Sequence, residues 1–186
     1  MCHTLLDDPK LHTLLLCIDE EQAAETRSTG CACGGRLHRA DYPRKPRGGP
    51  RDLDDAHRMR RSFCCGICRK RCTPLSVRFL GRRVYLGAVV VLASAMRYGL
   101  TVQRVAQLTH WFGVPRQTLD RWRHWWHDDF VESDFWQDVR GRFVPPVQLT
   151  TLPASLLHRF TGPELAQRCV FALRFLAPLF RRHEER

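Results

Sequence analysis

The sequence predicts a mainly α-helical fold that also contains a small β zinc ribbon. Three features predict it: a capped helix start near the N-terminus, four cysteines at metal-ligand spacing, and two helical segments separated by a glycine. We expect an N-terminal helix in residues 1–30, the zinc ribbon in 31–76, a helix-turn-helix region in 77–127 and a C-terminal helical tail in 128–186. The 186 residues are enough for one ordinary domain or two small ones.

The N-terminal segment begins with a helix-start signal. Asp8 is placed to cap the helix and Pro9 to occupy its first position. Apolar residues then recur at helical spacing, at Leu11, Leu14, Leu15 and Ile18. We expect this helix to run to about Glu25, because the Ser-Thr-Gly sequence of residues 28–30 is a stop signal.

The ribbon segment has two short strand candidates, residues 36–42 and 60–65. Between them, residues 43–50 contain three prolines and two glycines and are predicted to form a loop. The loop is basic, and its candidate contacts to a phosphate backbone are Arg44, Lys45 and Arg47. A solvated basic loop without a ligand is the alternative.

Four cysteines have the spacing of a structural metal site. Cys31 and Cys33, followed by glycine, form one pair, and Cys65 and Cys68 form the other. Structural zinc takes four soft ligands in a tetrahedron, commonly from two such pairs. We therefore predict one structural Zn²⁺ held by these four thiolates, although the first pair has one intervening residue where two are usual.

Other ligand sets stay open. Cys64 could replace Cys65, His38 could stand in for a ligand of the first pair, and Cys72 is a spare thiol. The alternative to a metal site is a set of free, partly buried thiols. We prefer that alternative for Cys2, Cys17 and Cys169, which have no partner at ligand spacing. A redox pair is disfavoured, because the second cysteine pair does not lie between a strand and a helix.

The longest apolar stretch, residues 84–96, is flanked by Arg83 and Arg97. It is shorter than the roughly 18 residues of a membrane span, so we predict a buried core helix over 82–98 that ends at Gly99. The first nine residues contain two aspartates and no basic region, unlike a signal peptide. We expect a cytoplasmic, nucleoid-associated protein with no membrane partner.

The segment after this helix predicts a helical pair. Thr101 is a candidate N-cap for a helix that ends near His110, with an apolar face of Val105, Ala106 and Leu108. Residues 111–114 are predicted to form the turn, in which Gly113 takes the left-handed conformation, and Pro115 to open a second helix. Two short helices joined by a glycine turn are typical of a DNA-recognition pair.

The second helix of this pair has two unlike faces. Leu119, Trp122 and Trp126 share one face, and we expect them to pack in the core. The other face contains the candidate DNA-binding residues, which are Arg116, Gln117, Asp120, Arg121 and His124. In the major groove, arginine suits the edge of guanine and glutamine that of adenine. An ordinary helical hairpin is the alternative, because the predicted turn is longer than in the compact motif.

The tail predicts three further helices, over residues 132–141, 153–160 and 163–175, the last terminated by Pro178. They contain no motif, and we interpret them as core completion or a partner surface. His124 and His127, near Asp128, are interpreted as surface groups rather than as a metal or acid–base site.

The basic charge lies in the middle of the chain. The sequence has 30 Lys and Arg against 19 Asp and Glu, a formal net charge of +11. Residues 1–30 contain 2 basic and 6 acidic groups, residues 31–98 contain 16 and 4, residues 99–127 contain 4 and 1, and residues 128–186 contain 8 and 8. A GC-rich genome could produce many arginines, but it would not confine the net positive charge to residues 31–127. This distribution therefore predicts binding to a polyanion.

Three stretches of this sequence resemble the N-terminal DNA-binding halves of bacterial insertion-sequence transposases and the small standalone proteins similar to them. They are Cys31-x-Cys33-Gly-Gly, residues 61–83, and Gly-Val-Pro-Arg-Gln-Thr-Leu-Asp-Arg-Trp over 113–122. The resemblance covers about residues 31–126. It implies that ribbon and helices bind terminal inverted repeats, while a separate acidic-triad nuclease domain cuts and joins strands. We expect no such domain here, because too little chain follows Trp126.

The function expected from the sequence is that of a non-catalytic, sequence-specific double-stranded DNA-binding protein of a mobile element. It would be a truncated or accessory product, and it could also act as a repressor. The expected partners are duplex DNA and either a second copy of the chain or a separate transposase catalytic subunit. The alternatives are an RNA- or single-strand-binding protein and a small metal-dependent nuclease or redox enzyme, for which persuasive paired carboxylates are lacking.

Overall fold

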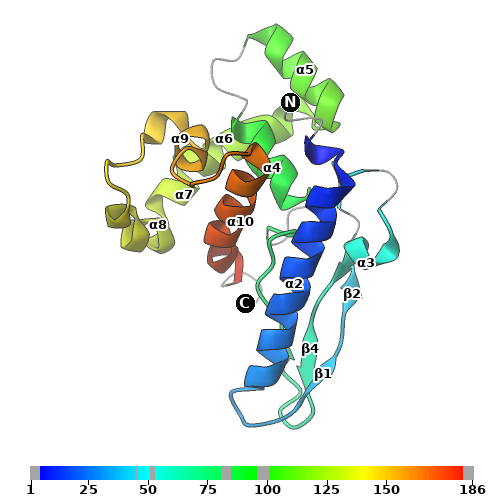
Figure 1. Ribbon diagram of the computed structural model, residues 1–186. Helices are drawn as coiled ribbons and strands as arrows, with labels where there is room; N and C mark the ends of the chain where they lie inside the picture. The colour runs from blue at the N-terminus through cyan, green and yellow to red at the C-terminus, as the bar shows by residue number, and fades with distance from the viewer. Residues whose placement is uncertain (1–4, 45, 51–52, 81–84, 96–100, 182–186) are drawn as a thin grey trace. The chain divides into compact units, whose positions relative to one another are not determined.

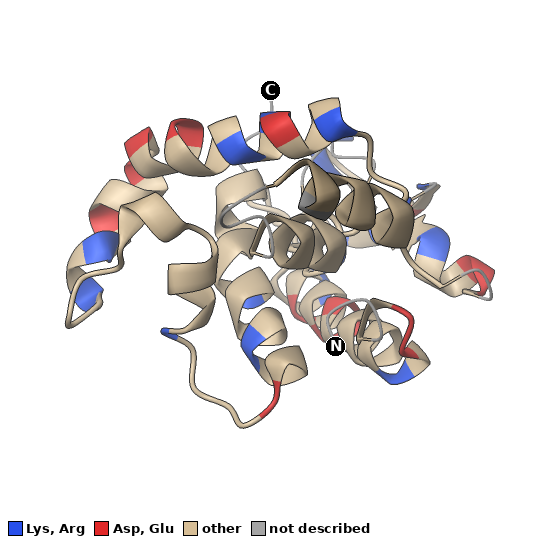
Figure 2. Cartoon of the chain, turned by 90° about the horizontal axis from the view of Figure 1, so that it is seen from above, with Lys and Arg blue, Asp and Glu red and all other residues tan. Residues whose placement is uncertain are grey.

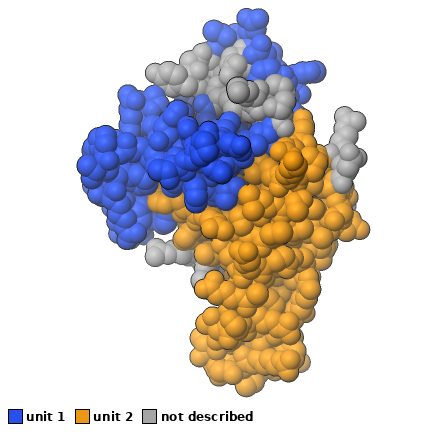
Figure 3. Space-filling view, in the orientation of Figure 1, with its two compact units in different colours: residues 1–5, 88–172 blue, residues 6–87, 173–186 orange. Residues whose placement is uncertain are grey.

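The computed structural model describes residues 5–44, 46–50, 53–80, 85–95 and 101–181 (Figure 1). The fold is mainly helical with small antiparallel sheets, as predicted. The chain divides into two compact units (Figure 3). The ribbon unit comprises Leu6–Gly87 with Leu173–Arg186, and the helical unit comprises Met1–Leu5 with Ala88–Ala172. Each unit thus combines separate stretches, whereas the sequence predicted four consecutive segments.

The ribbon unit opens with helix α2, Pro9–Thr29. Its start is as predicted, because the Asp8 side chain accepts a hydrogen bond from the Lys10 amide at 2.9 Å. The predicted end near Glu25 is wrong by four residues. Ser28 and Thr29 lie within the helix, where their hydroxyls donate to the Glu25 carbonyl at 2.8 and 3.0 Å, and Gly30, with a φ of +78°, forms the C-cap.

In the described part of the chain, five short strands follow α2 in two antiparallel sheets. The first sheet has the order β1 (Leu37–Arg39), β4 (Phe63–Cys65) and β5 (Arg71–Cys72). The second pairs β2 (Tyr42–Pro43) with β3 (Met59–Arg60). In the first sheet Leu37 lies opposite Cys65.

Each of the two predicted strands is thus divided, which corrects the expected continuous strands 36–42 and 60–65. The break lies where Asp41 faces Arg61 and Ser62. Asp41 accepts hydrogen bonds from the Ser62 amide at 3.0 Å and from the Arg61 guanidinium at 2.8 Å. This carboxylate takes the place of a backbone partner, so the regular ladder is interrupted there.

The ribbon sheet packs against α2, alongside which its strands lie (Figure 1). The buried contacts come from Ala23 of α2 and from Leu37, Phe63 and Cys65 of the strands. Helix α3, Asp55–Arg58, precedes β3 and is capped by Asp54.

Helix α4 spans Gly87–Ala95, and Gly87 is the last residue of the first stretch of the ribbon unit. Residues Ala88–Ala93 are almost completely buried. A buried helix was predicted here over 82–98. Residues 82–84 and 96–98 of that range, and Gly99, lie outside the described residues.

The helical unit continues with α5 (Val102–Phe112), α6 (Arg116–His127), α7 (Asp129–Glu132) and α8 (Asp134–Val139). Two 3₁₀ turns, η1 (Arg140–Arg142) and η2 (Leu149–Thr151), precede α9 (Ala154–Leu157), and α10 (Leu165–Arg181) crosses into the ribbon unit.

The predicted tail helices need three corrections. The first starts at Asp134 rather than residue 132, because Ser133 caps it by accepting from the Trp136 amide at 3.2 Å. The second is reduced to Ala154–Leu157. The third continues through Pro178 to Arg181. Proline removes one hydrogen bond there, but its neighbours Leu176, Ala177 and Phe180 are buried and keep the helical course.

An aromatic core packs α6, α7 and α8 together. Trp126, Phe130 and Trp136 are fully buried, with ring centroids 5.2 Å apart for the first pair and 5.0 Å for the second. Trp122 is also buried. The prediction that Trp122 and Trp126 pack in the core is confirmed. None of the described helices is long and apolar enough to cross a membrane.

Candidate metal centre and nucleic-acid interface

Two tight turns position the four cysteines. The first follows α2 directly, where the Gly34 amide donates to the Cys31 carbonyl at 2.8 Å and Gly34 has a φ of +78°. The second joins β4 to β5, where the Arg69 amide donates to the Cys65 carbonyl at 3.1 Å. Both turns lie at the same end of the sheet, because β1 pairs with β4.

The four thiols form one cluster. The sulfur atoms of Cys31, Cys33, Cys65 and Cys68 all lie within 4.8 Å of one another. The Cys31–Cys68 and Cys33–Cys65 Sγ distances are 3.6 and 3.5 Å. A tetrahedral metal with bonds of about 2.3 Å would place its sulfurs about 3.8 Å apart, whereas a disulfide requires about 2.05 Å. The cluster is therefore close enough to hold a metal ion.

Hydrogen bonds and crowding give these thiols unlike acidities. Hydrogen bonds from the backbone amides of Cys68 and Ile67 lower the pKa of Cys65 to about 6, although burial acts in the opposite direction. The Lys70 amide lowers the pKa of Cys68, but hydrogen bonding to Cys33 and burial outweigh it and raise this pKa to about 12. Four adjacent thiols cannot all ionise without a cation between them. The arrangement thus favours a bound cation.

Gly35 gives the cluster its space. A Cβ atom at this position would overlap Cys65 Sγ and would also crowd the Ile67 side chain. The sequence marked this glycine only as part of the motif after Cys33, so its steric role is a result of the structure.

The alternative ligands lie elsewhere. Cys64 Sγ is 3.5 Å from the Arg69 carbonyl oxygen, on the other face of β4 from Cys65. His38, which pairs with Cys64 across the sheet, is exposed. Cys72 packs against the buried core of the ribbon. In the described part of the chain, no other group of three or more His, Cys, Asp or Glu side chains comes close enough to hold a metal.

The turn before α6 is shorter than predicted. Helix α5 continues to Phe112 rather than ending near His110, so only Gly113, Val114 and Pro115 separate the helices. Gly113 has the predicted positive φ, at +59°. Pro115 is the N-cap of α6 and not its first residue.

The apolar face expected for α5 also needs correction. Ala106 is exposed and Val105 is half-buried. The buried residues of this stretch are Leu108, as predicted, with Phe112 and Val114.

Helix α6 separates its two faces as expected. Thr118, Leu119, Trp122 and Trp126 are buried, whereas the five candidate DNA-binding residues, Arg116, Gln117, Asp120, Arg121 and His124, are all exposed. The Arg121 guanidinium donates to Thr118 Oγ1 at 3.0 Å, and His124 Nδ1 lies 2.8 Å from Asp128 Oδ2.

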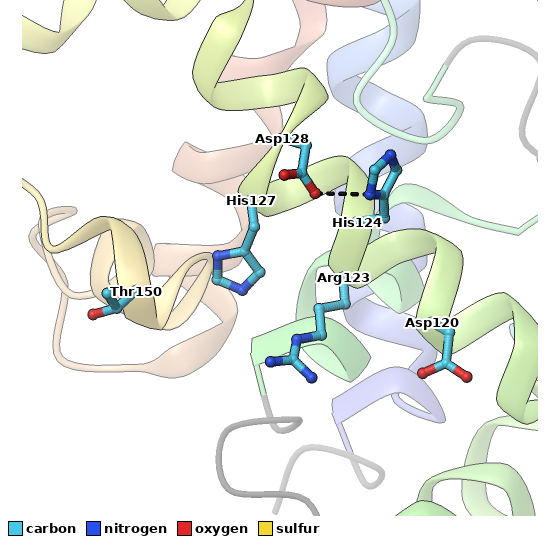
Figure 4. A pocket seen from close by; sticks show the side chains of 6 residues that line it. All are labelled: Asp120, Arg123, His124, His127, Asp128 and Thr150. Carbon is cyan, nitrogen blue, oxygen red and sulfur yellow. Dashed lines mark ion pairs between the residues drawn. The ribbon is translucent and has the colours of Figure 1, made fainter.

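A shallow hollow of about 540 Å³ lies beside this face (Figure 4). Its lining residues are Asp120, Arg123, His124, His127, Asp128 and Thr150. Of these, only Asp120 and His124 were among the predicted site residues; Arg123, His127, Asp128 and Thr150 were not. Arg123 could have been found from its position, because it lies three residues after the candidate Asp120 on the same helix.

The basic loop is partly engaged within the ribbon unit. The Arg44 guanidinium lies 5.6 Å from the centre of the Phe79 ring. Arg47 is exposed, and its carbonyl oxygen accepts from the Leu86 amide at 3.1 Å. Lys45 lies outside the described residues. Lysines and arginines are distributed over many elements instead of being confined to one helix (Figure 2).

Comparisons of the chain with protein families, with curated proteins and with solved structures find no match. The metal centre and the exposed face of α6 are therefore assigned from the residues and distances of this chain alone.

Proposed function

We propose that this chain is a non-catalytic, sequence-specific double-stranded DNA-binding protein whose ribbon folds around one structural Zn²⁺. The observation that carries the proposal is the division of α6. Its core-facing side chains are buried, while Arg116, Gln117 and Arg121 are exposed together. These are the side-chain types that read base edges in the major groove.

The order of elements before α6 supports this function. Helix α5, a three-residue turn with a left-handed glycine, and α6 follow one another as the two helices of a helix-turn-helix do. In that motif the second helix enters the major groove. We therefore assign α6 as the recognition helix.

The donor set supports zinc. Four thiolates are soft ligands, which suit Zn²⁺ in a tetrahedral site better than they suit Mg²⁺ or Ca²⁺. The cluster joins the end of α2 to the β4–β5 turn, so a metal there would tie together segments more than 30 residues apart in sequence. A metal in this position stabilises a fold.

Two alternative functions are less well supported. Single-strand binding relies on aromatic faces that stack with bases. In the ribbon unit, Arg71 covers one face of Tyr42 at 5.4 Å, and Arg44 and Arg78 lie 5.6 and 4.9 Å from the centre of Phe79. A metal-dependent nuclease needs a carboxylate-rich metal site, and the described residues form no such group.

The resemblance to insertion-sequence transposases adds a biological context to the proposal. The protein would recognise the ends of a mobile element, together with a second copy of the chain or a separate catalytic subunit.

Selection from random nucleic-acid pools tests the proposal. Zinc-loaded protein is offered duplex DNA, single-stranded DNA and RNA pools in parallel at fixed salt. We expect one shared motif to be enriched from the duplex pool. The variant Arg116→Ala/Arg121→Ala should lose this enrichment, and the charge-matched control Arg140→Ala/Arg142→Ala, which alters exposed residues of η1, should retain it. Enrichment from the single-stranded or RNA pools alone, or no common motif, would overturn the proposal.

A further inference from the structure

The two cysteine turns form one compact end of the ribbon unit, which we call the ribbon tip and define as residues 31–36 and 66–70. The two segments are connected by hydrogen bonds as well as by the thiols. The Gly66 amide donates to the Arg36 carbonyl at 3.0 Å and so joins the two segments, while the Cys31 amide closes the first segment by donating to the Gly35 carbonyl at 3.2 Å. The tip is therefore a defined surface and not a loose loop.

An aliphatic side chain projects from this tip. Ile67 is 72% exposed, although it lies between Cys65, which is fully buried, and Cys68, which packs against the core. Its Cβ and Cγ1 lie over Gly35, where a side chain would crowd them. Because isoleucine is branched at Cβ, its rotamers are few. Ile67 is thus held outward in a restricted orientation.

The ribbon tip also contains three exposed cations. Arg36, Arg69 and Lys70 are all exposed on the tip. The chain contains no Asp or Glu between residues 26 and 40, nor between residues 56 and 119. Some of this charge balances the formal −2 of four thiolates on a divalent metal. Three exposed cations nevertheless exceed that charge, which leaves the tip attractive to a polyanion.

We propose that the ribbon tip is a second contact to duplex DNA, in the minor groove. Arg36, Arg69 and Lys70 bind the phosphates that border the groove, and Ile67 inserts between two base pairs and unstacks them. Apolar wedges flanked by cations act in this way in proteins that kink DNA. This inference rests on the proposed duplex-binding function. It adds a second DNA-contacting surface beside α6 and a local unstacking of the duplex.

The unstacking by Ile67 can be measured with 2-aminopurine, placed in turn at each position of a duplex recovered by the selection above. Wild-type protein should raise the fluorescence at one step severalfold. Ile67→Ala should return it to the value of free DNA and weaken binding about tenfold, with the metal content unchanged. The control is Val144→Ala, which shortens another exposed aliphatic side chain, outside α5 and α6, and should leave the signal intact.

The cations are tested by the salt dependence of binding. Arg69→Ala/Lys70→Ala removes two phosphate contacts, so the slope of log affinity against log salt should decrease by about 2. Metal content is measured on the same samples, because these residues also neighbour the thiolates. A reduced slope with full metal content supports the contact, whereas an unchanged slope, or one that falls only with loss of metal, overturns it.

The two proposals fail in different ways. If wild-type protein does not bind duplex DNA, both are wrong. If it binds the duplex but raises no fluorescence, or if Ile67→Ala raises it as much as wild type does, only the role of the ribbon tip is wrong.

Discussion

Arg78 and Asp19 form a buried ion pair within the ribbon unit. Arg78 Nε donates to Asp19 Oδ2 at 2.7 Å, and the two side chains are 3% and 1% exposed. Asp19 also accepts from the Val77 amide and the Ser76 hydroxyl, at 2.8 and 2.6 Å. Arg78 donates further to the Met59 carbonyl at 3.0 Å. Both charged groups thus make several hydrogen bonds, and together they connect α2, β3 and the segment after β5.

We predict that Asp19→Ala lowers the free energy of unfolding by about 3–5 kcal/mol, because it leaves the Arg78 charge buried without its partner. Chemical denaturation of the metal-loaded protein measures this loss. Glu21→Ala removes a carboxylate from an exposed position of the same helix and should change stability by no more than about 0.5 kcal/mol. Equal effects of the two substitutions would mean that the pair does not stabilise the fold.

The metal centre predicts a contrast between two adjacent cysteines. Purified protein should contain one zinc per chain, and Cys65→Ser should lose the metal and unfold the ribbon, because structural zinc contributes directly to folding. Cys64→Ser should keep both, since Cys64 Sγ faces the Arg69 carbonyl instead of the cluster. Elemental analysis with circular dichroism decides between them. Iron in place of zinc would change the identity of the metal but keep the site, whereas metal-free wild-type protein would refute the site.

Gly35→Ala should also release the metal, although it removes no ligand. The added Cβ would overlap Cys65 Sγ, so either this ligand atom or the turn that contains Gly35 would have to move. Gly141→Ala is the matched control, because a Cβ at Gly141 meets no atom within 4 Å. Zinc titration of both variants with a competing chelator checks the prediction. Equal zinc affinities would show that the ribbon can relax around the extra methyl group.

Local signals in the sequence predicted much of the ribbon unit. The start of α2 follows from Asp8 and Pro9, which act on their immediate neighbours. The ligand set follows from cysteine spacing, because ligands close in sequence occupy one turn. Between Cys64 and Cys65 the sequence left the choice open. The two side chains point to opposite faces of β4, so only one of them can reach the cluster. The pairing of β1 with β4 is needed to know that the face with Cys65 is the buried one.

The errors arose where contacts distant in sequence outweigh local preference. The strand break depends on the pairing of Asp41 with Arg61, residues 20 positions apart, which no periodicity encodes. Pro178 is a helix terminator by local rules, yet the buried Leu176 and Phe180 hold α10 in a helical course past it. Arg123 was missed because the sequence divides α6 only into two faces. The hollow that Arg123 lines also needs Thr150, a residue of η2 that is distant in sequence.

His12 predicts a pH dependence of stability. Burial lowers the pKa of His12 below the ordinary value of 6.5, and the nearby His57 acts in the same direction. The hydrogen bond to the Leu6 carbonyl and the charges of Asp7 and Asp8 oppose this shift but do not outweigh it. As the pH falls below 6.5, the unfolded chain therefore takes up a proton that the folded chain refuses, and stability decreases. Urea unfolding at pH 7.5 and 5.5 should show a larger loss for wild type than for His12→Gln. Identical losses would mean that His12 titrates alike in both states.

The last prediction separates base recognition from general charge on α6. Arg121 is exposed on the face opposite Leu119 and Trp122, and its guanidinium is oriented by a hydrogen bond to Thr118. If Arg121 reads a base, Arg121→Ala should cost about 1–3 kcal/mol of binding free energy on the selected duplex and much less on a scrambled one. Arg140→Ala removes the same charge elsewhere in the helical unit and should affect both duplexes alike. Affinities of each variant for both duplexes, measured at one salt concentration, provide the comparison. Equal losses on both duplexes for Arg121→Ala would make α6 a scaffold helix with a basic surface and would leave recognition to another element.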